Sequence, residues 1–194
     1  MRSSVAVVHE LVSQLQPVDE TEAAHRSQVL WWLSRTDDVF RRVKPTVPPQ
    51  HLVSYVVPVD AADGSILLVD HVNAGLWLPP GGHVEVDEHP ARTAQREAHE
   101  ELGLTAADPE LDQRPMFLTV TETVGMDAGH TDVSLWFVLD GRREQALSPD
   151  HGEFHRVRWW APAELRAADP SRFDPHLLRF LDKLERSPGS SEFS

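Results

Sequence analysis

The sequence predicts one domain that mixes strands and helices, of the α/β or α+β class and not a helical bundle. Three observations favour this class. Segments typical of strands lie among segments with helical spacing of apolar residues, and not apart from them. The chain has 194 residues, which suits one compact domain with an extension and is short for two full domains. Its residues are 40% hydrophobic and 25% charged, as in ordinary folded proteins.

Two amphipathic helices are expected at the N-terminal end, over residues 3–17 and 19–35. In the first, valines and leucines recur at helical spacing, and Pro17 ends the helix. The second begins at Asp19 with further acidic residues, which suit a helix N-terminus. Its tryptophan-containing apolar face must be buried on the rest of the chain, across a homodimer, or as a cap over a substrate pocket. The proline-containing run KPTVPPQ over residues 44–50 predicts a linker.

From residue 51 the pattern changes to strands connected by turns. Two strands are expected at HLVSYVVPVD and SILLVDHV, joined by the turn AADG, and LWLPPGG predicts a short strand that runs into a glycine loop. A helix is expected over HPARTAQREAHEELGL, with Pro90 in its first turn and Gly103 at its C-terminal cap. Further strands are expected at MFLTVTETV, DVSLWFVLDG and FHRVRWW, and helices at PAELRAA and over residues 175–184. The small, polar residues 188–194 predict a disordered tail.

Charge and composition exclude several classes of protein. The chain has 18 lysine and arginine residues against 31 aspartate and glutamate residues, a net charge of −13, which repels nucleic acid polymers and anionic lipids. No stretch reaches the roughly 20 apolar residues needed to span a bilayer, so no membrane partner is expected. Because cysteine is absent, disulfides and thiolate metal sites are excluded. With no secretory pattern at the start, the expected location is cytoplasmic.

The most distinctive chemistry lies on the helix expected over residues 89–104. Glu97, Glu100 and Glu101 stand at positions i, i+3 and i+4, which brings three carboxylates to one helical face. A solvated acidic face is the common alternative, but like charges at this spacing repel unless a positive charge lies between them. Clustered carboxylate oxygens suit Mg²⁺, with Mn²⁺ as the alternative. Zinc is not expected, because the eleven histidines are scattered along the sequence.

Neighbouring residues strengthen the interpretation as a metal site. Arg96 lies four residues before Glu100 and could hold a carboxylate in place. Gly81 and Gly82 follow a strand, where glycine lets the backbone turn sharply and approach a ligand. The loop after them returns to the helix, so the Gly81 carbonyl oxygen and Glu88 could reach the same carboxylates.

The segment from Gly82 to Leu104 resembles the Nudix box, G-x5-E-x7-R-E-U-x-E-E-x-G-U, in which U is apolar, and all nine specified positions match. Seven of them require a single residue type, so a coincidence is negligible. The resemblance extends over about residues 50–187. It implies a Nudix-type mixed β-sheet sandwiched between helices (α/β/α) over residues 49–187. Residues 1–48 then form an N-terminal helical extension with a linker, and residues 188–194 the tail.

The resemblance also implies a reaction and a set of roles. A Mg²⁺- or Mn²⁺-dependent hydrolase of this family would cleave a phosphoanhydride bond in a nucleoside diphosphate linked to another group. The implied metal ligands are three carboxylates and one backbone carbonyl: Glu97, Glu100, Glu101 and Gly81. Arg96 and Glu88 would orient the helix carboxylates as supporting groups.

The catalytic base is left open by the resemblance, because Nudix enzymes differ on this point. Glu97, inside the box, is one candidate. Glu153, which precedes the strand FHRVRWW, is another, and its alternative is an ordinary surface position. Three weaker candidates lie in the preceding hairpin: Glu122, Asp127 and Asp132.

The substrate is predicted less closely than the reaction. Substrate contacts are expected from Gly81, Gly82 and His83, the last of these at a phosphate. Residues that mark several Nudix subfamilies are missing; Thr119, for example, stands where ADP-ribose hydrolases have proline. A nucleoside triphosphate, cleaved to the monophosphate and diphosphate, is the first prediction. The alternatives are nucleotide sugars or other diphosphate-linked metabolites, and a non-catalytic ligand sensor with the same fold.

Overall fold

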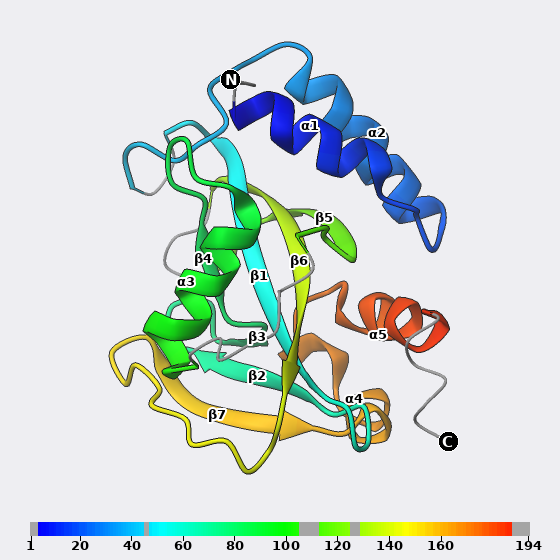
Figure 1. Ribbon diagram of the computed structural model, residues 1–194, viewed down its shortest axis with the longest axis vertical. Helices are drawn as coiled ribbons and strands as arrows, with labels where there is room; N and C mark the ends of the chain where they lie inside the picture. Colours follow the sequence, from blue (N-terminus) through cyan, green and yellow to red (C-terminus); the bar gives the residue numbers. More distant parts are fainter. Residues whose placement is uncertain (1–3, 45–46, 105–112, 125–128, 188–194) are drawn as a thin grey trace.

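The computed structural model describes residues 4–44, 47–104, 113–124 and 129–187. The tail expected over residues 188–194 lies outside the described residues. A seven-stranded mixed sheet has helices on both faces, which confirms the expected α/β/α arrangement (Figure 1). Within the described ranges, no helix combines the length and the hydropathy that a bilayer crossing needs.

Each helix and strand expected from the sequence is present. The strands are β1 (Gln50–Asp60), β2 (Ile66–His71), β3 (Leu76–Leu78), β4 (Gly81–His83), β5 (Phe117–Glu122), β6 (Thr131–Gly141) and β7 (Phe154–Trp160). The helices are α1 (Ser4–Gln14), α2 (Glu20–Leu33), α3 (Pro90–Leu102), α4 (Pro162–Ala167) and α5 (Leu177–Arg186), with a 3₁₀ turn at Pro170–Arg172. One expectation was wrong: the glycine loop begins with strand β4, because Gly81, Gly82 and His83 pair with β1.

β1 and β6 form the centre of the sheet. They pair in parallel along their whole length, from Gln50 opposite Thr131 to Asp60 opposite Gly141. β5 pairs with β6, while β2 and β4 pair with opposite ends of β1. The parallel pairing therefore aligns the starts of two strands that are far apart in the sequence.

Successive side chains of a strand point to opposite faces of the sheet, and this divides the hydrophobic core into two clusters. In β2, Leu67 and Val69 belong to one cluster, whereas Ile66 and Leu68 belong to the other. Residues of α1, α2 and α3 complete the first cluster, and residues of α4 and α5 complete the second. This alternation is the reason why the sheet is covered on both faces.

The N-terminal helices bury their apolar face on the same chain. α1 and α2 lie side by side and pack on the first cluster (Figure 1). Their buried residues in this cluster are Val5, Val8, Val12, Val29 and Leu33. Of the three expectations for this face, the structure therefore shows burial against the rest of the chain. Trp31 is the exception on α2, with 61% of its surface exposed and Arg35 over its ring.

Asp19 connects the start of α2 to α5. Its side chain accepts a hydrogen bond from the backbone N–H of Glu22, and its two carboxylate oxygens accept bonds from Arg179 at 2.8 and 2.6 Å. The hydrogen bonds from Arg179 are the main reason why the pKa of Asp19 is lowered from 3.8 to about 2. Because the pKa is lower in the folded state, the carboxylate adds stability above the unfolded value, and this contribution is lost as the pH falls from 3.8 toward 2.

We expect the variant Asp19→Asn, which keeps the capping oxygen, to have a lower Tm than the wild type at neutral pH. The difference in Tm should shrink as the pH falls below 3.8 and disappear below about pH 2, where the wild-type carboxylate is protonated as well. Thermal melts followed by circular dichroism across this pH range measure the difference. A gap that stays constant over the whole range would show that the charge of Asp19 adds nothing to stability.

Candidate active site

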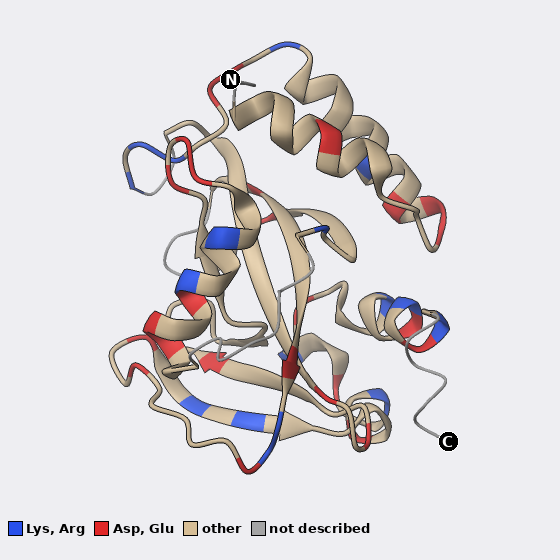
Figure 2. Ribbon diagram, in the orientation of Figure 1, with Lys and Arg blue, Asp and Glu red and all other residues tan. Residues whose placement is uncertain are grey.

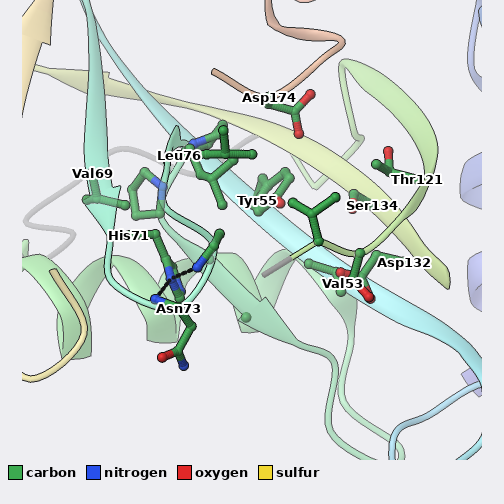
Figure 3. A pocket seen from close by; sticks show the side chains of 18 of the residues that line it. Val53, Tyr55, Val69, His71, Asn73, Leu76, Thr121, Asp132, Ser134 and Asp174 are labelled. Atoms are coloured by element: carbon green, nitrogen blue, oxygen red, sulfur yellow. Dashed lines mark hydrogen bonds between the residues drawn. The ribbon is translucent and has the colours of Figure 1, made fainter. Parts of the chain in front are cut away.

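A pocket of about 840 Å³ opens beside the centre of the sheet (Figure 3). Its walls come from β1, β2, β4, β5, β6 and α3, and from the loops before β7 and α5. The volume is in the range of small-molecule sites. Six residues predicted for the site line this pocket: Gly81, Gly82, His83, Glu97, Glu101 and Glu153. The sheet therefore brings together residues of the glycine loop, of the helix and of the segment before β7.

The two glycines are required by close contacts. A Cβ on Gly82 would lie 2.2 Å from Oε1 of Glu97, and a Cβ on Gly81 would lie 2.2 Å from the carbonyl oxygen of Ser54. The backbone N–H of Gly81 donates a hydrogen bond of 2.9 Å to Oε2 of Glu101. Because Gly82 has no side chain, Glu97 can approach the backbone of β4 directly, and the absence of a side chain on Gly81 lets β4 lie close to β1.

Arg96 connects the carboxylates that surround it on α3. Its guanidinium donates hydrogen bonds to Glu97 at 2.7 Å, to Glu100 at 3.1 Å and to both oxygens of Glu88 at 3.2 Å. The hydrogen bonds to Glu88 are the largest cause that raises the pKa of Arg96 further above its usual value. Thr93 donates a hydrogen bond of 2.7 Å to Glu88 and fixes it in turn. Arg96 and Glu88 thus have contacts that would orient the metal-binding carboxylates, and this role stays a prediction.

The glutamates of the box have different environments. Glu97 and Glu101 are 9% and 6% exposed, whereas 57% of the Glu100 side chain is exposed, and Glu100 is not among the residues that line the pocket. Burial, with the negative charges of Glu97 and Glu153 next, raises the pKa of Glu101 to about 9. Burial also raises the pKa of Glu97. The structure therefore separates one solvent-facing glutamate from two buried ones.

Buried carboxylates of like charge fit a site for a dication. Without a positive charge, burial and mutual repulsion hold at least one of these carboxyls in the protonated form. A divalent cation among the oxygens of Glu97, Glu101 and Glu153 would remove that cost. Because all these donors are oxygens, they suit hard ions such as Mg²⁺ and Mn²⁺.

Glu153 reaches the cluster from the loop before β7. It lines the pocket, and its side chain is within hydrogen-bonding reach of Glu101. Two backbone hydrogen bonds hold this loop: Val72 N–H donates to the Glu153 carbonyl at 2.9 Å, and Asp150 N–H donates to the Glu101 carbonyl at 3.0 Å. Glu153 is exposed and lies beside the box glutamates. A base at this position could reach a water molecule bound among them.

The weaker candidates from the hairpin have different positions. Glu122 and Asp132 line the pocket, whereas Asp127 lies outside the described residues. His83 also lines it, and burial, followed by the positive charge of Arg41, lowers the pKa of His83 to about 2. The histidines are scattered along the sequence but not in the folded structure, where His51, His83 and His130 lie together with Asp132.

Sequence reasoning missed two polar residues of the pocket, Tyr55 and Asp174 (Figure 3). Tyr55 is partly buried on β1. Asp174 is 6% exposed, accepts a hydrogen bond of 2.8 Å from the backbone N–H of His176, and has its pKa raised to about 6 by burial. The backbone N–H of Asp174 also donates to the carbonyl oxygen of Trp77. Neither residue belongs to a motif, so no signal in the sequence could have identified them.

Comparisons with known proteins agree with this geometry. The NUDIX domain model matches residues 49–184, so α1 and α2 precede the matched region. A MutT-like protein of Streptomyces ambofaciens is 39% identical over 140 residues, which cover 72% of this chain and 81% of that protein. The human m7GpppN-mRNA hydrolase NUDT17 is 27% identical over 159 residues, which cover 70% of this chain and 48% of NUDT17. The chain thus spans about half of the human relative.

Solved structures match the same region. A NUDIX-family hydrolase from Clostridium perfringens is 26% identical with a TM-score of 0.51, and the match covers 70% of this chain and 98% of that chain. An Ap4A hydrolase from C. elegans is 19% identical with a TM-score of 0.52, and the match covers 69% of this chain and 94% of that chain. The second likeness is one of fold alone.

Proposed function

The chain belongs to the Nudix family of hydrolases, which act on phosphoanhydride bonds in nucleoside diphosphate derivatives, and from this premise we propose that it converts nucleoside triphosphates to the monophosphate and diphosphate. The reaction we propose depends on Mg²⁺, or on Mn²⁺ as the alternative. The observation that carries the proposal is the convergence of Glu97, Glu101 and Glu153 on a pocket bordered by Gly81 and Gly82.

The α3 carboxylates are the proposed metal ligands. Glu97 and Glu101 would contribute buried oxygens, Glu100 a more exposed one, and Gly81 its carbonyl oxygen. Bound metal would neutralise charge on the phosphate oxygens and lower the pKa of an attacking water. Arg96 would hold Glu97 and Glu100 in place through the hydrogen bonds described above.

Glu153 is the proposed general base. It would take a proton from the water whose oxygen forms the new bond to phosphorus, while the bond between the α- and β-phosphates breaks and diphosphate leaves. Glu97 is the alternative base. Oε1 of Glu97 already accepts a hydrogen bond of 2.7 Å from Arg96, whereas Glu153 is exposed at the edge of the pocket, and this position favours Glu153.

Other residues of the pocket suit the two ends of a nucleotide. Arg41 and Lys44 contribute positive charge to the lining, which favours a phosphate chain in a protein of net charge −13. Asp174, with a pKa of about 6, can accept or donate a hydrogen bond near neutral pH and could bind the edge of a nucleobase. The human relative named as an m7GpppN-mRNA hydrolase supports a substrate that contains a nucleotide.

A substrate screen tests the proposal. Purified protein is incubated with nucleoside triphosphates, nucleotide sugars and dinucleoside polyphosphates, with Mg²⁺ or Mn²⁺ or with EDTA, and the products are separated by ion-exchange chromatography. We expect monophosphate and diphosphate from triphosphates, without free orthophosphate and only with metal. Cleavage of nucleotide sugars or dinucleotides alone would favour the first alternative. Nucleotide binding without turnover of any substrate would favour the ligand sensor.

A further inference from the structure

A second group of metal-ligating side chains lies where β1 and β6 begin. It consists of His51 on β1, His83 on β4, His130 directly before β6, and Asp132 on β6; we refer to it as the histidine cluster. One ligand atom of each residue lies within 4.8 Å of the other three. His51 and His130 are buried, and the other two are half-buried. None of the four belongs to α3, which carries the box glutamates.

Strand pairing assembles the cluster. His51 stands opposite Asp132 in the parallel pair of β1 and β6, and His83 stands opposite Val53 in the antiparallel pair of β1 and β4. The rings of His51 and His130 stack with centroids 4.8 Å apart, and the ring of His83 is also 4.8 Å from that of His51. Three separate strands or strand starts therefore converge on one point.

The hydrogen bond of His51 fixes which ring nitrogen faces the cluster. Nδ1 lies 2.8 Å from the carbonyl oxygen of Pro48, and because a carbonyl only accepts, Nδ1 carries the proton. In the neutral ring, Nε2 then presents a lone pair. His51 is 0% exposed, and its Nε2 has no hydrogen-bond partner among the described residues; the same holds for Nε2 of His83 and Oδ1 of Asp132. Buried polar atoms without a partner are rare, which indicates a missing ligand.

The two distances to Asp132 agree with a tetrahedral ion. Nε2 of His51 and Nε2 of His130 each lie 3.3 Å from Oδ1 of Asp132. An ion with bonds of about 2.0–2.1 Å to such ligands has ligand atoms about 3.3 Å apart. The bond from His51 Nδ1 to a backbone carbonyl is also the contact that orients metal-binding histidines in proteins.

We propose that the histidine cluster binds one transition-metal dication of the Zn²⁺ class, at a site distinct from the carboxylates of α3. Imidazole nitrogens suit Zn²⁺ and related metals, whereas Mg²⁺ prefers oxygen. An anion such as phosphate is disfavoured, because Asp132 presents a carboxylate oxygen to two of the rings. Arg41 and Lys44 add positive charge near His83, and Asp132 adds a negative charge within the cluster. The proposal does not rest on the proposed hydrolase activity.

Metal binding to the full chain tests the proposal. After treatment with a chelator, the protein is titrated with Zn²⁺ and, separately, with Co²⁺, whose visible absorption reports four-coordinate geometry. We expect one equivalent of tight binding, a higher Tm with Zn²⁺ and a four-coordinate Co²⁺ spectrum. The variants His83→Ala and Asp132→Asn should bind at least about 100-fold more weakly. His155→Ala, at an exposed histidine on β7, is the matched control and should bind like the wild type.

The variant Glu101→Gln distinguishes metal binding at the histidine cluster from metal binding at the carboxylates of α3. It removes a carboxylate of α3 and should leave Zn²⁺ affinity and the Co²⁺ spectrum unchanged. Loss of binding in Glu101→Gln, with retention in His83→Ala and Asp132→Asn, would overturn the proposal. X-ray absorption of the zinc-loaded wild type counts imidazole ligands without relying on any variant: three are expected, and none or one would overturn the site. Absence of tight binding by the folded wild type would overturn it as well.

Discussion

Glu101→Gln is expected to lower metal-dependent turnover by about 10²–10³-fold, the range seen when one key electrostatic contact of an active site is removed. Glu101 lies at the centre of the carboxylates: it accepts the N–H of Gly81 at 2.9 Å and is next to Glu97 and Glu153. Glutamine has nearly the same shape but carries no charge, so a dication would lose a ligand. Steady-state kinetics across Mg²⁺ concentrations measure the loss.

The same substitution should not weaken the fold. In the metal-free protein, Glu101 is buried beside two other negative charges, and burial and repulsion both disfavour its charged form. Because the raised pKa of about 9 keeps this carboxyl largely neutral near pH 7, an uncharged glutamine of similar shape should melt in EDTA close to the wild-type Tm. A loss of activity that came with a lower Tm would indicate unfolding and not a missing metal ligand.

Glu100→Gln offers a comparison on the same helix, at the more exposed of the proposed metal ligands. Its side chain is 57% exposed and does not line the pocket, so we expect turnover to fall far less than in Glu101→Gln. If Glu101→Gln turned over substrate at the wild-type rate, the proposed metal site would be ruled out. Equal losses in both variants would mean that the total charge of the helix matters and not the buried position.

The box could be predicted from the sequence because its parts are close along the chain. Gly82, Glu88 and the glutamates of α3 lie within one loop and one helix, where helical spacing fixes which side chains share a face. The α/β/α layers were predicted from the resemblance to the Nudix family, and the continuous apolar run of β2 agrees with a sheet that is covered on both faces.

The histidine cluster could not be predicted in this way. His51 and Asp132 meet only through the register of a parallel pair, which depends on the packing of the whole sheet and leaves no local signal. Strand β4 was missed because glycine is rare in strands, whereas the pairing uses backbone groups that every residue provides. Asp174 reaches the pocket through a loop whose path is set by tertiary contacts such as the bond to Trp77.

The second large effect is expected at Glu22, a buried residue that joins the N-terminal helices to the rest of the domain. Glu22 is 0% exposed, and its carboxylate lies 2.7 Å from Nζ of Lys183 on α5. It also accepts the backbone N–H of Val18 at 2.7 Å and that of Leu118 on β5 at 3.3 Å. One side chain therefore connects α2 with the edge strand and with the C-terminal helix.

Lys183→Met should lower the free energy of unfolding at neutral pH by about 3–5 kcal/mol, because it leaves the Glu22 carboxylate buried without its cation. Adding Glu22→Gln to this variant should recover part of the loss, since glutamine carries no charge and its amide oxygen can still accept one of the two backbone N–H groups. Urea unfolding of the two single variants and the double variant measures the coupling. Arg186→Met, at an exposed position of α5, is the control and should change stability by less than about 0.5 kcal/mol.

The cost of Lys183→Met should also depend on pH. Burial raises the pKa of Glu22 even when Lys183 is present, and loss of that cation raises it further. A carboxyl whose pKa is higher in the folded state favours folding below its unfolded value of 4.5, and that advantage is lost as the pH rises through the folded value. The variant should therefore approach wild-type stability below pH 4.5 and fall away from it toward neutral pH. A loss of the same size at every pH would mean that Lys183 stabilises the fold through the packing of its methylene chain and not through its charge.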